Sequence, residues 1–221
     1  MPVIDVSKKG YIVGSYFNNQ ADARDDDSGA HHDATSHIVG YAVQWLRTSG
    51  RGGTLMRYIR TFLYFDTSSV TSTVGSCTLQ IASGATNTSA DVIGVKSTAF
   101  GGDGGTNLAD DDFNNVDFST AYTTANTSWS TSSNSLTLTA TALADMKNND
   151  YLIIALVEHD SDYPDTDTSN GTFGAGIAFG SSIRLNYTLA GYSNNVNGVA
   201  AANIAKVNGV ATANISKVNG I

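Results

Sequence analysis

The sequence predicts an all-β protein, an antiparallel jelly-roll-like β-sandwich that is followed by a short repetitive C-terminal tail. Three observations predict this fold. Strand-like segments recur along the chain, whereas only residues 143–147 resemble a helical turn. Several segments alternate apolar and polar residues, as in a sheet with one face in water. Ser, Thr, Asn, Asp and Gly fill the stretches between them and favour turns over helices.

The predicted strands follow one another with short spacings that suit a sandwich. They span residues 37–46, 56–65, 77–82, 91–97, 135–140, 151–159, 174–180 and 183–189, with 11–17 as a ninth. The strand at 183–189 is apolar at its odd positions and therefore covers one face of the core. Residues 151–157 are apolar throughout, which predicts a central strand covered on both faces. Ser181 and Ser182 predict a tight hairpin between the last two strands.

The chain divides into a sandwich domain, residues 1–190, and a tail, residues 191–221. About 190 residues suit one β-sandwich and can bury a core without disulfide bonds. The single cysteine, Cys77, has no partner for an intrachain disulfide and lies in an apolar run, which predicts a buried structural thiol. The predicted core side chains are Phe62, Leu152, Ile154, Leu156 and Leu185.

Charged residues are scarce, at 14% of the chain, and the net charge is -8. A surface with few Lys and Arg repels phosphates, which excludes nucleic acid as a partner. The sequence has no basic run and no stretch of about 20 apolar residues, so membrane insertion is not expected. The first residues lack the apolar core and the cleavage site of a signal peptide. A composition typical of outside surfaces without an export sequence predicts a virion protein released by lysis, or export by a route that the sequence does not reveal.

Two long polar connections, residues 18–36 and 100–134, are places to look for surface function, because loops beyond about 12 residues are often functional. The first carries His31, His32 and Asp33, and His37 follows it. Such a cluster can ligate a transition metal, but its spacing matches no zinc motif and no cysteine is near. A solvated loop is the alternative.

Acidic residues alternate with other residues after the predicted central strand. Side-chain oxygens in this pattern form the kind of array that Ca²⁺ accepts. The predicted calcium ligands are Asp160, Asp162, Asp165, Asp167, Ser169 and Asn170. The segment is not an EF-hand, because Gly171 stands one place late and no Glu closes the loop. A plain acidic turn without an ion is the alternative.

No catalytic motif is recognisable, since the chain holds no nucleophile elbow, phosphate loop or zinc-hydrolase helix. Glu158 is the only glutamate, and nothing in the sequence selects a pair of aspartates for glycoside hydrolysis. We therefore expect that the protein is not an enzyme. Tyr122, Trp129 and Tyr163 lie in predicted loops, where their rings can either stack on sugars or anchor the loops in the core.

The tail repeats eleven residues nearly twice and begins a third copy. Asn-Gly pairs, which favour tight turns, start at positions 197, 208 and 219. The apolar positions around them, the predicted assembly residues, are Val196, Val199, Ile204, Val207, Val210, Ile215, Val218 and Ile221. We favour extended segments between turns over a right-handed coiled coil, because each Gly costs roughly 1 kcal/mol in a helix. Two and a bit repeats are too few to bury their apolar side chains by themselves. We therefore expect the tail to dock on its own domain, a sister chain or another protein. A free linker is the alternative.

The stretch "RTFLYFDTSSV" at 60–70, followed by a strand after a short polar gap, resembles the opening of DNRLRE-type and related carbohydrate-binding-module-like β-sandwiches. The later "LADMKNNDYLIIALVEHD" and "GAGIAFGSSIRLNYTL" are similar to the C-terminal half of those domains. The resemblance implies the sandwich fold. It places none of the calcium and sugar ligands common in that family on residues of this chain.

The stretch "IAKVNGVA" at 204–211 resembles the C-terminal repeats on structural proteins of tailed phages, often behind lectin-like sandwich domains. It implies a non-enzymatic virion structural protein, displayed on the capsid or a tail fibre, whose repeat is the docking or oligomerisation element. The implied partners are other virion proteins and copies of the chain itself, with a cell-surface glycan in addition. The alternative is an extracellular carbohydrate-binding or adhesion module of a bacterium.

Overall fold

The computed structural model describes residues 2–27, 29–33, 38–87, 90–168, 170–190, 206–207 and 210–211. The strands of its sandwich are β1 (Val3–Asp5), β2 (Lys8–Val13), β3 (Ala30–Asp33), β4 (Ile38–Gly50), β5 (Gly53–Asp66), β6 (Val74–Ile81), β7 (Gly84–Asn87), β8 (Val92–Ser97), β9 (Val116–Ala121), β10 (Asn134–Thr137), β11 (Tyr151–Glu158), β12 (Gly171–Ala178) and β13 (Ile183–Leu189). Between them lie the helices α1 (Gln20–Arg24) and α2 (Ala140–Asn148) and the 3-10 segments η1 (Phe100–Gly102) and η2 (Asp110–Asn114). The all-β prediction is confirmed.

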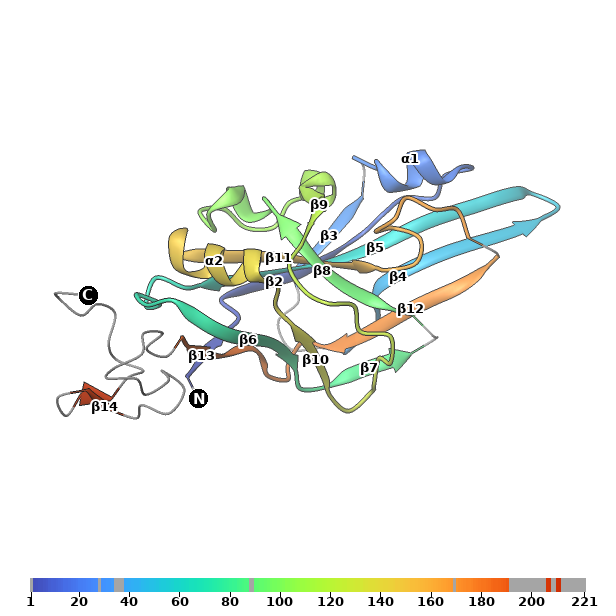
Figure 1. Cartoon of the computed structure of the whole chain (residues 1–221). Helices are drawn as coiled ribbons and strands as arrows, with labels where there is room; N and C mark the ends of the chain where they lie inside the picture. The colour runs from blue at the N-terminus through green and yellow to red at the C-terminus, as the bar shows by residue number, and fades with distance from the viewer. Residues whose placement is uncertain are drawn as a thin grey trace.

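Two antiparallel sheets form the sandwich. The small sheet has the order β1-β13-β6-β10, and the large sheet has the order β7-β12-β4-β5-β11-β8-β9, with β2 beside β5 and β3 beside β2. After β5 the chain passes to β6 in the small sheet, back to β7, β8 and β9 in the large sheet, across to β10, back to β11 and β12, and across again to β13 (Figure 1). This alternation between sheets gives the antiparallel β-sandwich that the sequence predicts.

The central strand is β11, which pairs with β5 on one side and β8 on the other. Its side chains Leu152, Ile154 and Leu156 belong to the core between the two sheets. The alternate side chains, such as Ile153 and Val157, belong to a second core on the outer face of the large sheet. The segments α1, η1 and η2 cover this outer face. Each buries one apolar side chain in the second core, namely Ala23 from α1, Phe100 from η1 and Phe113 from η2. The prediction of a strand covered on both faces is therefore confirmed.

The five predicted core side chains are all buried, with at most 1% of their surface exposed. Leu185 joins the core between the sheets, whereas Phe62 lies in the outer core. Cys77 is also buried and unpaired, as predicted. In the part of the chain that the structure describes, no helix is long and apolar enough to cross a membrane.

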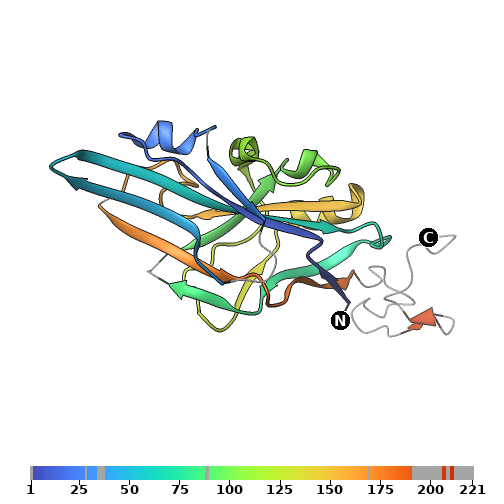
Figure 2. The same ribbon diagram turned by 180° about the vertical axis from the view of Figure 1, so that it is seen from behind.

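β4 and β5 form a long hairpin that projects at one end of the molecule (Figures 1 and 2). Gly50 pairs with Gly53 at its tip. Gly53 has a φ of 100°, a left-handed conformation that favours glycine. Beyond Ile59 the strand β5 leaves β4 and pairs with β2, while β11 runs along its other edge. A single strand of fourteen residues therefore joins the projecting hairpin to the centre of the sandwich.

Two local predictions differ from the structure. Ser181 and Ser182 do not close a hairpin, because β12 lies in the large sheet and β13 in the small one, so the two serines carry the chain between sheets. The predicted helical turn at 143–147 is part of the longer α2, which begins three residues after β10 ends at Thr137. Thr139 caps it, since its side chain accepts a hydrogen bond from the Ala142 N–H.

Candidate functional site

The loop after β11, residues 158–168, is held to the large sheet by a buried ion pair. Arg60 on β5 is fully buried, and its Nε and Nη2 donate to both carboxylate oxygens of Asp162 at 2.8 and 2.7 Å. The remaining Arg60 donors reach the carbonyls of Phe113 on η2, at 2.8 Å, and Arg24 on α1, at 2.9 Å. One guanidinium thus joins the loop, α1 and η2 on the outer face of the large sheet.

Further hydrogen bonds fix this loop along its length. Ser161 is hydrogen-bonded to the Tyr58 hydroxyl at 2.8 Å, and the indole N–H of Trp45 donates to Thr168 at 2.6 Å. Glu158 accepts from the N–H groups of Asp160 and Ser161 at 3.0 and 2.7 Å. Burial nevertheless raises the pKa of the Glu158 carboxyl above its usual range. The loop is therefore a rigid part of the sandwich.

The structure does not bring the predicted calcium ligands to one point. Asp162 faces Arg60, Asp165 lies 3.8 Å from Arg24, and Asp167 pairs with Arg47 at 2.8 Å. Asn170 accepts from Ser49 at 3.0 Å, and Ser169 is outside the described residues. Because each of three carboxylates already contacts an arginine, the arrangement is that of the alternative, an acidic loop neutralised by cations. Calcium binding by this set stays an untested prediction without geometric support.

One of those six residues, Asp160, lies in a different cluster. Across the described ranges, one group of three His, Cys, Asp or Glu side chains has ligand atoms that lie within 4.8 Å of one another, namely Asp91, His159 and Asp160. His159 Nδ1 is 2.8 Å from Asp160, and its ring stacks on Tyr163. Asp91 precedes β8, and its backbone carbonyl accepts from the His159 N–H at 2.9 Å.

The other predicted histidine cluster does not converge where the structure describes it. His31 and His32 lie in β3 rather than in a loop, and successive strand residues point to opposite faces. His31 pairs with Asp110 of η2, whereas the ring of His32 stacks on Tyr11 at 4.9 Å. His37 lies outside the described residues.

Two of the three aromatic side chains considered for glycan contact are buried. Tyr122 is 2% exposed and donates its hydroxyl proton to Asp145, and Trp129 is 3% exposed and donates its indole N–H to the Gly176 carbonyl at 3.2 Å. A buried ring cannot stack on a sugar, so the alternative of core packing applies to both. Tyr163 is half-buried, and glycan contact through it stays a prediction.

The sandwich begins and the tail leaves it at the same end. β1 pairs with β13, and the Tyr187 N–H donates to the Pro2 carbonyl at 3.1 Å. The Ala190 N–H donates to the Thr73 carbonyl at 2.8 Å just before the tail starts. This end lies opposite the tip of the β4–β5 hairpin (Figures 1 and 2).

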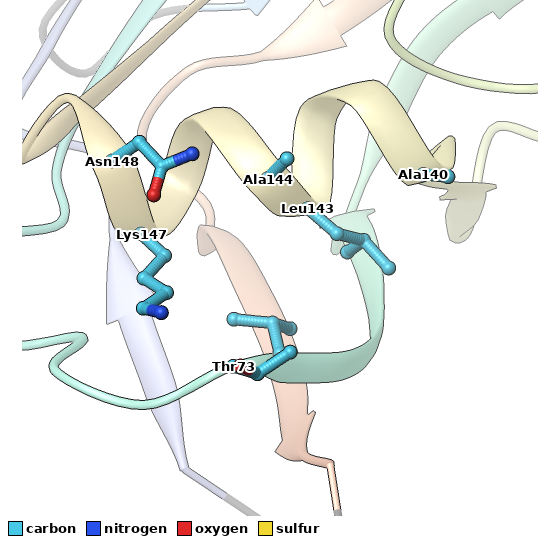
Figure 3. A pocket seen from close by; sticks show the side chains of 7 residues that line it. Thr73, Ala140, Leu143, Ala144, Lys147 and Asn148 are labelled. Atoms are coloured by element: carbon cyan, nitrogen blue, oxygen red, sulfur yellow. The ribbon is translucent and has the colours of Figure 1, made fainter.

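A shallow groove lies beside the exit of the tail. It has a volume of about 310 Å³ between α2 and the start of β6. Leu143, Ala144 and Lys147 line it from the helix and Thr73 from the strand side (Figure 3). Leu143 and Lys147 extend from α2 towards Thr73 in this view. The groove is therefore partly apolar, and one of its lining residues, Thr73, accepts the hydrogen bond from Ala190 at the start of the tail.

Few of the predicted assembly residues can be placed. Val207 and Val210 pair with each other in a separate antiparallel ladder, β14 (Lys206–Val207) with β15 (Val210–Ala211). Asn208 and Gly209, where the sequence predicts a turn, lie outside the described residues. The other six, Val196, Val199, Ile204, Ile215, Val218 and Ile221, lie outside the described residues.

Sequence reasoning missed Arg60 and Asp91. Arg60 stands in an otherwise apolar strand, and a charge in such a strand requires a buried partner, so its presence could have pointed to an ion pair. Nothing in the sequence indicates that Asp91 meets His159, because the contact depends on the pairing of β8 with β11.

No protein-family model matches the chain, and no curated protein matches it.

Proposed function

We propose that this chain is a non-enzymatic structural protein of a tailed-phage virion, displayed on the capsid or on a tail fibre. In this proposal the sandwich is the displayed part. The repeat tail is the element that attaches it to copies of itself and to other virion proteins. Its localisation is then the released particle.

One observation supports the proposal: Ala190, where the tail begins, and the tip of the β4–β5 hairpin lie at opposite ends of the sandwich (Figures 1 and 2). The exit of the tail at Ala190 lies beside β1, and the β4–β5 hairpin projects from the opposite end (Figure 1). A module attached through its tail would therefore point the hairpin tip, with its exposed Arg51 and Gly52, away from the attachment. The periodic Val and Ile residues of the tail support docking over a free linker, which gains nothing from them.

The groove beside Thr73 is the surface that we propose for the tail of a neighbouring copy. It lies next to the exit of the tail. In a closed ring of copies, the tail of each copy would lie in the groove of the next. Val74 and Leu143 offer apolar contact to a Val or Ile side chain of the repeat.

Analysis of purified particles tests the virion role. We expect the protein to stay with the particles through high-salt washing, at a fixed copy number set by the symmetry of the capsid or fibre. Its absence from washed particles, or a copy number that varies between preparations, would show that the proposal is wrong. Specific binding on a glycan array without particle association would favour the adhesion module instead.

A substitution in the groove tests the docking surface. Ala144 is exposed on α2 and lines the groove, so Ala144→Arg fills the groove without disturbing the core. We expect it to reduce incorporation into particles at least about tenfold, as the loss of a central contact does. The matched control is Thr141→Arg, which is exposed on the same helix but does not line the groove. Equal incorporation of both variants would contradict docking at this place.

A further inference from the structure

Asp91, His159 and Asp160 form a preorganised group at one end of two paired strands. Asp91 directly precedes β8, and His159 and Asp160 directly follow β11. The register places Val92 opposite Glu158, and the hydrogen bond from the His159 N–H to the Asp91 carbonyl extends this ladder by one more pair. The backbone therefore fixes the relative positions of the three residues before any ligand arrives.

The group has more negative charge than its surroundings neutralise. Among the described residues, no lysine or arginine forms an ion pair with Asp91 or Asp160, whereas Asp162, Asp165 and Asp167 each meet an arginine. A bound cation would offset the charges of the two carboxylates.

The donor atoms select the class of cation. Imidazole nitrogen together with carboxylate oxygen suits zinc and the neighbouring transition ions, whereas Ca²⁺ and Mg²⁺ take oxygen ligands alone. Ligand atoms around a tetrahedral zinc ion lie about 3.3 Å apart, given bonds of about 2.0–2.2 Å. Ligand atoms that already lie within 4.8 Å of one another reach this spacing with small side-chain rotations.

We propose that Asp91, His159 and Asp160 bind one divalent transition ion, with Zn²⁺ as its representative. All three side chains are half-buried or exposed, which leaves a coordination position open to water. Stacking on the Tyr163 ring, with centroids 5.9 Å apart, orients the imidazole. The ion would join the start of β8 to the loop that the Arg60–Asp162 ion pair anchors. This site is independent of the proposed virion role.

Calorimetric titration of the full chain with Zn²⁺ and, separately, with Ca²⁺ tests the site. We expect one Zn²⁺ per chain, with Ca²⁺ bound at least about 100-fold more weakly because it disfavours nitrogen. His159→Phe keeps the ring on Tyr163 but removes both nitrogens, and Asp91→Asn removes one charge. Each should weaken Zn²⁺ binding at least about tenfold, and circular dichroism should show each variant folded. The matched control, His31→Phe, alters another His–Asp pair and should leave Zn²⁺ binding unchanged.

Three outcomes would overturn the assignment. The first is no Zn²⁺ binding by the unaltered chain. The second is Zn²⁺ binding that stays unchanged in both His159→Phe and Asp91→Asn, or that is lost only in His31→Phe. The third is Ca²⁺ binding as tight as that of Zn²⁺ and unaffected by His159→Phe, which would move the site to oxygen ligands elsewhere in the loop.

Discussion

Arg60 illustrates how a single buried residue determines the placement of separate segments. It stands on β5, and its guanidinium donates four hydrogen bonds, two to Asp162 in the loop, one to the Arg24 carbonyl on α1 and one to the Phe113 carbonyl on η2. The guanidinium also lies 4.0 Å from the centre of the Phe113 ring. With its partners in place the buried charge is compensated, and without Asp162 it would not be.

Replacing Asp162 should destabilise the fold strongly. Asp162→Asn leaves the Arg60 charge buried without a counter-charge, so we expect the free energy of unfolding to fall by about 3–5 kcal/mol in urea denaturation. The matched control is Asp167→Asn, because Asp167 is exposed and pairs with the half-buried Arg47. It should change stability by no more than about 1 kcal/mol. Equal effects of the two substitutions on the free energy of unfolding would show that the Arg60–Asp162 pair does not stabilise the fold more than an exposed ion pair does.

Cys77 should be chemically inert in the folded protein. Burial raises the pKa of its thiol to about 12, and 1% of the residue is exposed. At about pH 8 the thiol therefore stays protonated and shielded, although the thiolate is the species that alkylating reagents attack. We expect iodoacetamide to modify Cys77 only after urea unfolding, as measured by intact mass. Rapid alkylation under native conditions would show that β6 is packed differently.

At the scale of elements, the strands with the most regular patterns could be predicted from the sequence. The alternation of 183–189 and the continuous apolar run of 151–157 correspond to β13 and β11. β1, β3, β7 and β9 were not predicted, because they are short or polar and owe their pairing to neighbouring strands. The crossing between sheets at Ser181 and Ser182 was not predicted. Two serines between strands are compatible with a hairpin in one sheet and with a crossing to another, so the sequence does not distinguish the two.

The central strand offers the most direct test of the core. Leu156 on β11 is fully buried between the sheets, so Leu156→Ala should lower the free energy of unfolding by about 2–5 kcal/mol. Ser135→Ala, at an exposed position of β10, should change it by less than about 0.5 kcal/mol. Chemical denaturation of both variants measures the difference. A neutral Leu156→Ala would place the strand outside the core.

At the scale of the whole molecule, the sequence predicted the antiparallel β-sandwich but not the arrangement of its sites. The predicted calcium set was chosen by spacing along the chain, and the folded loop turns three of its aspartates to three different arginines. The candidate metal group joins Asp91 to residues almost seventy positions later, and only strand pairing brings them together. The groove beside the tail exit likewise depends on the packing of α2 against β6.

The mass of the protein in solution, with and without residues 192–221, tests the central claim most directly. Light scattering coupled to size exclusion should show a trimer or larger oligomer for the full chain, because each tail docks on a neighbouring copy. The shortened chain should be monomeric, with an unchanged far-ultraviolet circular dichroism spectrum, because strands β1 to β13 end at Leu189. If both chains form oligomers with the same number of copies, the tail is a spacer, and the account of an attached and a free end is wrong.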